Sequence, residues 1–198
     1  MGVSDSIQLK KHFKEINEET WSRAQSCIQA YTTGNYDFGI DFNVVMNITG
    51  YDSERAKLLL QAHAINDVGV INALSLLITF VGLVDNDATM GEERVTEIFN
   101  LFDFSRSGVL SLEDLTILLM CVSYSFSHVV QRHSDVPSDA AIIKLAQQIY
   151  DKLNKKYKQT IKRDELVMWA RMNLFEKGIT KIDTVFDAFV KTCDGFGV

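Results

Sequence analysis

The sequence repeats one pattern, in which a stripe of apolar residues at helical spacing is followed by a short polar loop and a second apolar stripe. In its clearest copy, Ile98, Phe99 and Phe102 share one helical face before the loop, and Leu115 and Leu119 share one after it. A helix buries such a stripe against another element, so the two helices are expected to pack together. The pattern therefore predicts helix–loop–helix units.

Capping signals mark where the helices of this copy begin. Thr89 precedes Glu92, and Ser111 precedes Asp114, by the three residues that a capping box requires. Pro137 is the only proline, so little interrupts helices elsewhere in the chain. The predicted fold class is all-α, without a convincing strand. Further helices are expected over residues 53–64, 71–84, 143–153, 166–173 and 182–189.

The loop of the clearest copy is twelve residues long and carries oxygen atoms at regular intervals. Gly108 is sixth, where the chain must turn sharply, and apolar Leu110 is eighth. This spacing matches the calcium loop of an EF-hand, whose oxygen ligands stand at positions one, three, five, seven, nine and twelve. The candidate metal ligands are Asp103, Ser105, Ser107, the carbonyl of Val109, Ser111 and Asp114.

On these residues the chain resembles the EF-hand superfamily, and three weaker frames of twelve residues fit elsewhere. They cover residues 33–44, 64–75 and 154–165, with Ile40, Ile71 and Ile161 in the eighth position. The resemblance implies paired helix–loop–helix modules that form two lobes. The expected organisation is an N-terminal arm over 1–19, a degenerate lobe over 20–88, a second lobe over 89–176, and a C-terminal helix and tail over 177–198.

The spacing of the frames resembles that of calaxin, the neuronal calcium sensors and calcineurin B, over roughly residues 20–189. Proteins of that branch bind helices of their targets, and the resemblance implies an amphipathic helix of another protein as the partner. Methionine and aromatic side chains would line the groove, although such residues form ordinary core in most helical proteins. The groove residues so implied are Met90, Phe99, Leu115, Leu119, Met120, Met168, Trp169 and Met172.

Calcium binding is expected to be weak or absent. The best loop has carboxylates only at Asp103 and Asp114, and its twelfth position lacks the longer glutamate that binds calcium through both oxygens. The shorter side chain would favour Mg²⁺. Alternatively, Ser111 and Asp114 only cap the helix that follows. In the last frame Lys156 and Lys158 stand where acceptor oxygens are needed, so we expect no calcium there.

Composition restricts the partners and the location. A formal net charge of −6 argues against nucleic acid, which requires clustered lysine and arginine. No apolar run reaches the ~18 residues that a membrane-spanning helix needs.

Three widely spaced cysteines, Cys27, Cys121 and Cys193, are typical of reduced and buried thiols in a cytoplasmic protein. Gly2 and Ser6 match the N-myristoylation pattern, and membrane association is expected only if Gly2 is acylated.

No phosphate-binding glycine loop or nucleophile motif is present in the sequence, so we do not expect an enzyme. The favoured interpretation is a non-catalytic adaptor or structural subunit of a larger intracellular assembly, cytoskeletal or ciliary if the resemblance to calaxin holds. The alternative is a calcium-responsive sensor, acylated at Gly2, or a phosphatase regulatory subunit. The last apolar stripe, Ile182, Val185, Phe186 and Phe189, would either fill the groove or complete the core.

Overall fold

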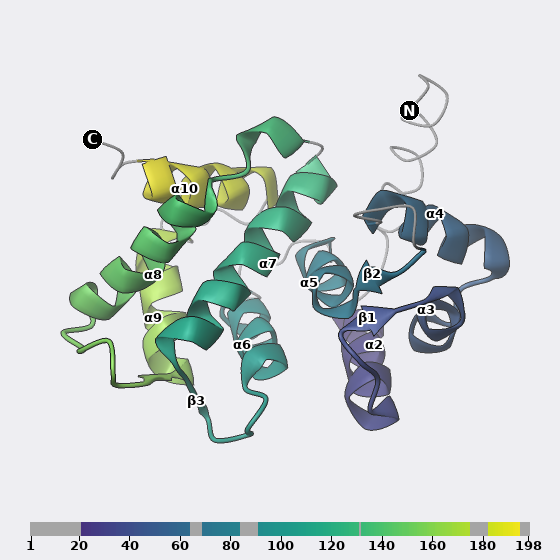
Figure 1. Ribbon diagram of the computed structural model, residues 1–198, viewed down its shortest axis with the longest axis horizontal. Coiled ribbons are helices and arrows are strands. Elements are labelled where there is room, and N and C mark those ends of the chain that lie inside the picture. The colour runs from purple at the N-terminus through teal and green to yellow at the C-terminus, as the bar shows by residue number, and fades with distance from the viewer. Residues whose placement is uncertain (1–20, 64–68, 84–90, 131, 175–181, 195–198) are drawn as a thin grey trace. The chain divides into compact units, whose positions relative to one another are not determined.

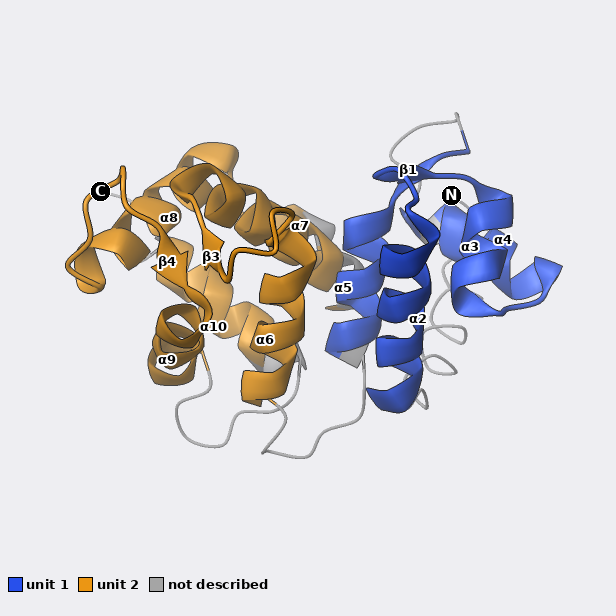
Figure 2. Ribbon diagram, turned by 90° about the horizontal axis from the view of Figure 1, so that it is seen from below, with its two compact units in different colours: residues 1–85 blue, residues 86–198 orange. Residues whose placement is uncertain are grey.

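The computed structural model describes residues 21–63, 69–83, 91–130, 132–174 and 182–194, and these residues are mostly helical (Figure 1). The predicted all-α class is confirmed. The chain divides into two compact units, residues 1–85 and 86–198 (Figure 2). The expected N-terminal arm, residues 1–19, lies outside the described residues.

The first unit contains two helix–loop–helix segments. Its elements are α2 (Trp21–Gly34), β1 (Gly39–Ile40), α3 (Phe42–Thr49), α4 (Ser53–His63), β2 (Ile71–Asn72) and α5 (Ala73–Leu83). Helix α2 packs against α3 and α5, and α3 packs against α4. The side chains from Ala73 to Val81 are all buried, including the hydroxyls of Ser75 and Thr79, so α5 forms the centre of this core.

The second unit repeats this plan and adds a further helix. Its elements are α6 (Gly91–Phe102), β3 (Val109–Leu110), α7 (Leu112–Val130), a 3₁₀ turn η2 (His133–Asp135), α8 (Asp139–Lys152), β4 (Ile161–Lys162), α9 (Arg163–Asn173) and α10 (Ile182–Asp194). Helix α6 packs against α7 and α9, and α10 lies on α7 and α8 (Figure 1). Among the described helices of the chain, none is long and apolar enough to cross a membrane.

Short antiparallel ladders join the loops within each unit, although the sequence predicted no strand. In the first unit Ile40 lies opposite Ile71, and in the second Leu110 lies opposite Ile161. These four residues are the eighth positions of the four twelve-residue frames, and each is at most 1% exposed. A ladder of two residues is too short to produce the alternation of apolar and polar residues that identifies a strand.

In the first unit, a polar side chain at the end of each strand caps the helix that follows: Asp41 comes directly after β1, and Asn72 is the last residue of β2. Asp41 Oδ1 accepts a hydrogen bond of 3.0 Å from the Val44 amide, and Asn72 Oδ1 accepts one of 2.9 Å from the Leu74 amide. Each side chain satisfies an amide that has no partner within its helix. The helix therefore starts at a fixed distance from the ladder, which positions the loops relative to the helices.

The last helix, α10, packs on the second unit through its apolar side. Val185, Phe186 and Phe189 are buried there. Arg132, just beyond α7, forms an ion pair with Asp187 and places its guanidinium carbon 5.5 Å from the centre of the Phe186 ring. Helix α10 is therefore held on α7 and α8 both by apolar burial and by an ion pair at its edge.

The predicted burial of the three cysteines is confirmed. Cys27 lies in the first unit, Cys121 lies on α7, and Cys193 lies in the last turn of α10. All three are at most 9% exposed, so they act as small apolar side chains in the two cores.

Candidate functional site

The first half of the loop from Asp103 to Asp114 brings its oxygen atoms together. Asp103 Oδ1 accepts the Ser107 amide at 2.9 Å, and Asp103 Oδ2 accepts the Gly108 amide at 2.6 Å. The Ser105 and Ser107 hydroxyls each lie 3.3 Å from Asp103 Oδ1 and 2.8 Å from each other. Gly108 turns the chain with a φ of 74°, which glycine adopts without steric cost. The side chains at positions one, three and five therefore converge.

The pKa of Asp103 lies below its ordinary value. Partial burial raises this pKa, but hydrogen bonds from the Gly108 and Ser107 amides and from two serine hydroxyls lower it by more. Asp103 is thus held as a carboxylate, which is the form that binds a cation.

The carbonyl of Val109, in the seventh position, accepts a long hydrogen bond of 3.4 Å from Ser107 Oγ.

The second half of this loop forms the predicted capping box. Asp114 Oδ2 accepts hydrogen bonds from the Ser111 amide at 3.1 Å and from the Ser111 hydroxyl at 2.8 Å. The Asp114 amide in turn donates to Ser111 Oγ at 3.1 Å. The two side chains begin α7 in the reciprocal way that this motif describes. One carboxylate oxygen of the twelfth position is therefore committed to helix capping.

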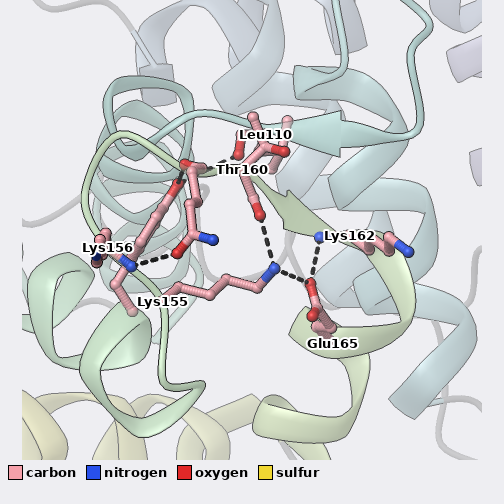
Figure 3. Close-up of polar contacts among 8 residues, drawn as sticks. Leu110, Lys155, Lys156, Thr160, Lys162 and Glu165 are labelled. Atoms are coloured by element: carbon pink, nitrogen blue, oxygen red, sulfur yellow. Dashed lines mark hydrogen bonds and ion pairs between the residues drawn. The ribbon is translucent and has the colours of Figure 1, made fainter.

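In the paired loop, residues 154–165, the ammonium group of Lys155 contacts two oxygen atoms of the same loop. Lys155 Nζ lies 2.9 Å from Glu165 Oε2 and donates a hydrogen bond of 2.9 Å to the Thr160 carbonyl (Figure 3). The Lys162 amide donates to the same Glu165 oxygen at 2.7 Å. Glu165 therefore starts α9 and also neutralises a lysine of its own loop.

These contacts keep Glu165 ionised. Partial burial raises its pKa, but the hydrogen bonds from the Lys162 amide and the Lys155 ammonium, with the charges of both lysines, bring the pKa below its ordinary value. Sequence reasoning singled out Lys156 and Lys158, which stand at ligand positions, but both are exposed. It missed Lys155, which stands at a position that supplies no ligand in the EF-hand frame.

A buried tyrosine connects the two loops. The Tyr150 hydroxyl lies 3.3 Å from the Leu110 carbonyl in one loop and 3.1 Å from the Gln159 carbonyl in the other. Burial and the negative charges of Glu113, Asp114 and Glu165 raise the pKa of Tyr150 to about 12. The phenol therefore stays neutral and can donate to these carbonyls. Its position in the last turn of α8, just before the loop, was the sequence signal available for it.

The hydrogen bonds within residues 103–114 indicate how well this loop would bind calcium. It offers one carboxylate in its first half, two hydroxyls and a carbonyl, while Asp114 shares its carboxylate with the helix cap. Among the residues that the structure describes, no three histidine, cysteine or carboxylate side chains form a group suited to a metal ion. Hydroxyl and carbonyl ligands are outside that finding, so the weak calcium affinity stays a prediction.

No known protein family matches the chain, and neither does any curated protein or solved structure with which it was compared. The functional interpretation therefore rests on the residues and their contacts.

The expected groove residues lie in different environments. Four are buried inside the second unit, and they are Phe99, Leu115, Leu119 and Trp169. Met120 is half-buried on α7. These side chains therefore contribute to the core of the unit, which is the alternative that the sequence left open for them.

Two other groove residues lie at the surface. Met168 and Met172 are 50% and 65% exposed and are separated by one turn of α9, so they share an open face. Met90 and Gly2 lie outside the described residues. The structure thus does not bring the seven described groove residues together along one open surface.

Proposed function

We propose that the chain is a non-catalytic, EF-hand-like adaptor that binds an amphipathic helix of a larger intracellular assembly without requiring calcium. The pairing of the eighth loop positions, Ile40 with Ile71 and Leu110 with Ile161, supports the EF-hand frames on which this rests. The loops of the second unit are also joined by their own side chains, so a calcium ion is not needed to connect them.

The observation that carries the proposal is the position of α10. This amphipathic helix lies on α7 and α8 and buries Val185, Phe186 and Phe189. A surface that accepts a helix of its own chain has the length and the apolar character that a partner's helix would need. We therefore place the binding surface on α7 and α8, where α10 occupies it in the isolated chain.

The test removes α10 and supplies it again as a separate peptide. Residues 1–174 would be mixed with a fluorescent peptide of residues 180–194, and binding would be followed by anisotropy. We expect saturable binding, and we expect much weaker binding of a control peptide with Phe186→Asp and Phe189→Asp. The full-length chain, whose surface is covered, should bind the peptide more weakly than the truncated one.

Two results of this experiment would contradict the proposal. If residues 1–174 lose their helical circular dichroism or aggregate, α10 is a permanent part of the core and the docking surface lies elsewhere. If the truncated chain stays folded but ignores the peptide, the helix-in-groove mechanism is wrong. A chain that passes both tests can then be used to capture its partner from native extract for mass spectrometry.

The nature of the assembly is a proposal that rests on resemblance. A cytoskeletal or ciliary structure is the version that the likeness to calaxin supports. Membrane association belongs to the proposal only if Gly2 is acylated, which intact-mass measurement of native protein would reveal as a myristoyl adduct.

A calcium-responsive sensor is the second candidate, and the convergence of the Asp103, Ser105 and Ser107 oxygens favours it. Titration calorimetry separates the two candidates. The adaptor proposal expects weak binding or none, whereas a dissociation constant at or below about 1 μM, within the range of sensors, would favour the sensor. Any binding that is seen should disappear with Asp103→Ala and persist with Asn154→Ala.

A further inference from the structure

Lys155 connects two acceptors of its loop that are five residues apart in the sequence. Its ammonium lies 2.9 Å from both Glu165 Oε2 and the Thr160 carbonyl oxygen, and its side chain is 16% exposed (Figure 3). A lysine in a solvated, charged loop would normally extend into water, because its side chain loses much conformational entropy when it is held. The inward position of Lys155 therefore calls for a specific interaction.

The two acceptors stand where calcium ligands would stand. In the EF-hand loop, the carbonyl of the seventh residue and the carboxylate of the twelfth bind the ion. Counted from Asn154, Thr160 is the seventh residue and Glu165 is the twelfth. The Lys155 ammonium thus meets the same two groups that a divalent cation would bind.

We infer that the Lys155 ammonium takes the place of the metal ion in the loop over residues 154–165. It supplies a cation that belongs to the chain, so Glu165 and the Thr160 carbonyl are held together at any calcium concentration. Since Glu165 also begins α9 and Ile161 pairs with Leu110, this cation supports both the helix and the ladder. The inference goes beyond the proposed function, because it holds whether or not a helix binds.

The neighbouring residues show that this is a property of Lys155 and not of lysine-rich loops in general. Lys156 and Lys158 are exposed, although they stand at positions three and five. In the other loop of the pair the second residue is Phe104, which is 52% exposed, and the twelfth is engaged by Ser111. Only one loop of the pair thus contains an ammonium at this place, among the residues described.

The first experiment measures stability. Lys155→Met keeps the length and the apolar stem but removes the charge, and Lys158→Met is the matched control in the same loop. Urea unfolding would be followed through Trp169 of α9 in a Trp21→Phe background, where it is the remaining tryptophan. We expect Lys155→Met to raise the unfolding equilibrium constant about tenfold or more, because charge-assisted hydrogen bonds are lost, and the control to change it less than about threefold.

The second experiment measures calcium binding, with Asp103→Ala present throughout to silence the other loop. One variant carries Lys156→Asp and Lys158→Asp, and a second adds Lys155→Met to these changes. Calorimetric titration with calcium chloride should show binding by the second variant that is at least about tenfold tighter than by the first, because a metal ion and the ammonium compete for the same oxygens. Circular dichroism would confirm the folded state of both.

The inference would be overturned by equal calcium affinity of the two variants, including no binding by either. It would also be overturned if Lys155→Met were no more destabilising than Lys158→Met. Where the multiple variants fail to fold, the stability comparison of the two single substitutions decides the matter.

Discussion

Three side chains hold the paired loops of the second unit, and each acts through a different chemistry. Lys155 supplies a positive charge, Asp114 accepts from the helix cap, and Tyr150 donates from a buried phenol. Each satisfies backbone groups that would otherwise lose hydrogen bonds to water upon burial. The loops are therefore held by contacts within the chain.

We expect Tyr150→Phe to lower the free energy of unfolding of the second unit by about 1 kcal/mol, because the Leu110 and Gln159 carbonyls lose a donor. Tyr157→Phe is the matched control, since Tyr157 is 47% exposed and its ring contacts that of Tyr150 edge-on. Urea unfolding followed by circular dichroism measures both. A control as destabilising as Tyr150→Phe would show that the hydroxyl contributes little.

The raised pKa of Tyr150 predicts a stability change in alkali. Above pH 10.0, the ordinary pKa of tyrosine, the phenol ionises in the unfolded chain. In the folded chain, where its pKa is about 12, the phenol is still neutral at that pH. Unfolding free energy should therefore decline as the pH rises above 10.0. Burial also raises the pKa of Tyr31 and Tyr124, but the last step in the phenolate absorbance of the native protein should be that of Tyr150, with a pKa of about 12. That late step should be absent from Tyr150→Phe.

Glu165 predicts the opposite dependence, in acid. Its pKa in the folded chain lies below the ordinary glutamate value of 4.5, so its contribution is present above 4.5 and is lost as the pH falls through the lower, folded value. Unfolding free energy should thus decline on acidification, and Glu165→Gln should flatten part of that decline. Asp164→Asn, at a side chain that is 90% exposed, is the control and should change the free energy of unfolding by less than about 0.5 kcal/mol.

At the scale of elements, the caps decide where helices begin. Ser111 and Asp114 start α7 reciprocally, and the same Asp114 stands at the twelfth position of the candidate metal loop. The Asp114 carboxylate therefore caps the helix and would also have to bind the metal ion. A longer side chain at this position would bring its second oxygen closer to the loop. The role of Asp114 at the start of α7 is thus one physical reason for the weak calcium affinity that we expect.

Lengthening the twelfth residue tests this link. We expect Asp114→Glu to increase calcium affinity measurably in calorimetry, because glutamate binds the ion through both oxygens. Ser111→Ala should lower the free energy of unfolding by about 1 kcal/mol through loss of the cap. If Asp114→Glu leaves calcium affinity unchanged, the twelfth position does not limit binding.

At the scale of the whole molecule, the chain consists of two units, each with its own helical core. The loops of the first unit have Val44 and Ser75 at their twelfth positions, so they lack the carboxylate that calcium needs. The second unit holds its loops through Lys155 and Tyr150. We therefore expect neither unit to depend on metal for folding.

Chelation provides the measurement. Thermal unfolding of the full chain, followed by circular dichroism, should give the same midpoint in excess calcium and in excess chelator. A protein whose loops needed calcium would be stabilised by the ion through mass action. A clear rise in the midpoint with calcium, lost in Asp103→Ala, would instead support the sensor candidate.

Much of the fold followed from the sequence because its signals are local. The helix expected over residues 53–64 is observed as Ser53–His63, and the Ser111–Asp114 box caps α7 as predicted. The twelve-residue frames placed the four eighth positions that pair in the ladders. Helical periodicity, caps and loop spacing all depend on residues within about one turn or one loop of each other.

By itself, the sequence determined the helical class, the starts of α4, α7 and α10 and the positions of the loops. Only the tertiary structure decided that Lys155 turns inward while Lys156 and Lys158 stay exposed, that Phe99, Leu115, Leu119 and Trp169 are buried, and that α10 lies on α7 and α8. A lysine side chain can extend in many directions. An apolar stripe has the same sequence pattern whether it lies in the core or lines a groove. The apolar stripe of α10 is covered by α7 and α8, which lie far from it in the sequence, and the direction of Lys155 depends on how its loop folds around Thr160 and Glu165, so helical spacing alone does not contain that information.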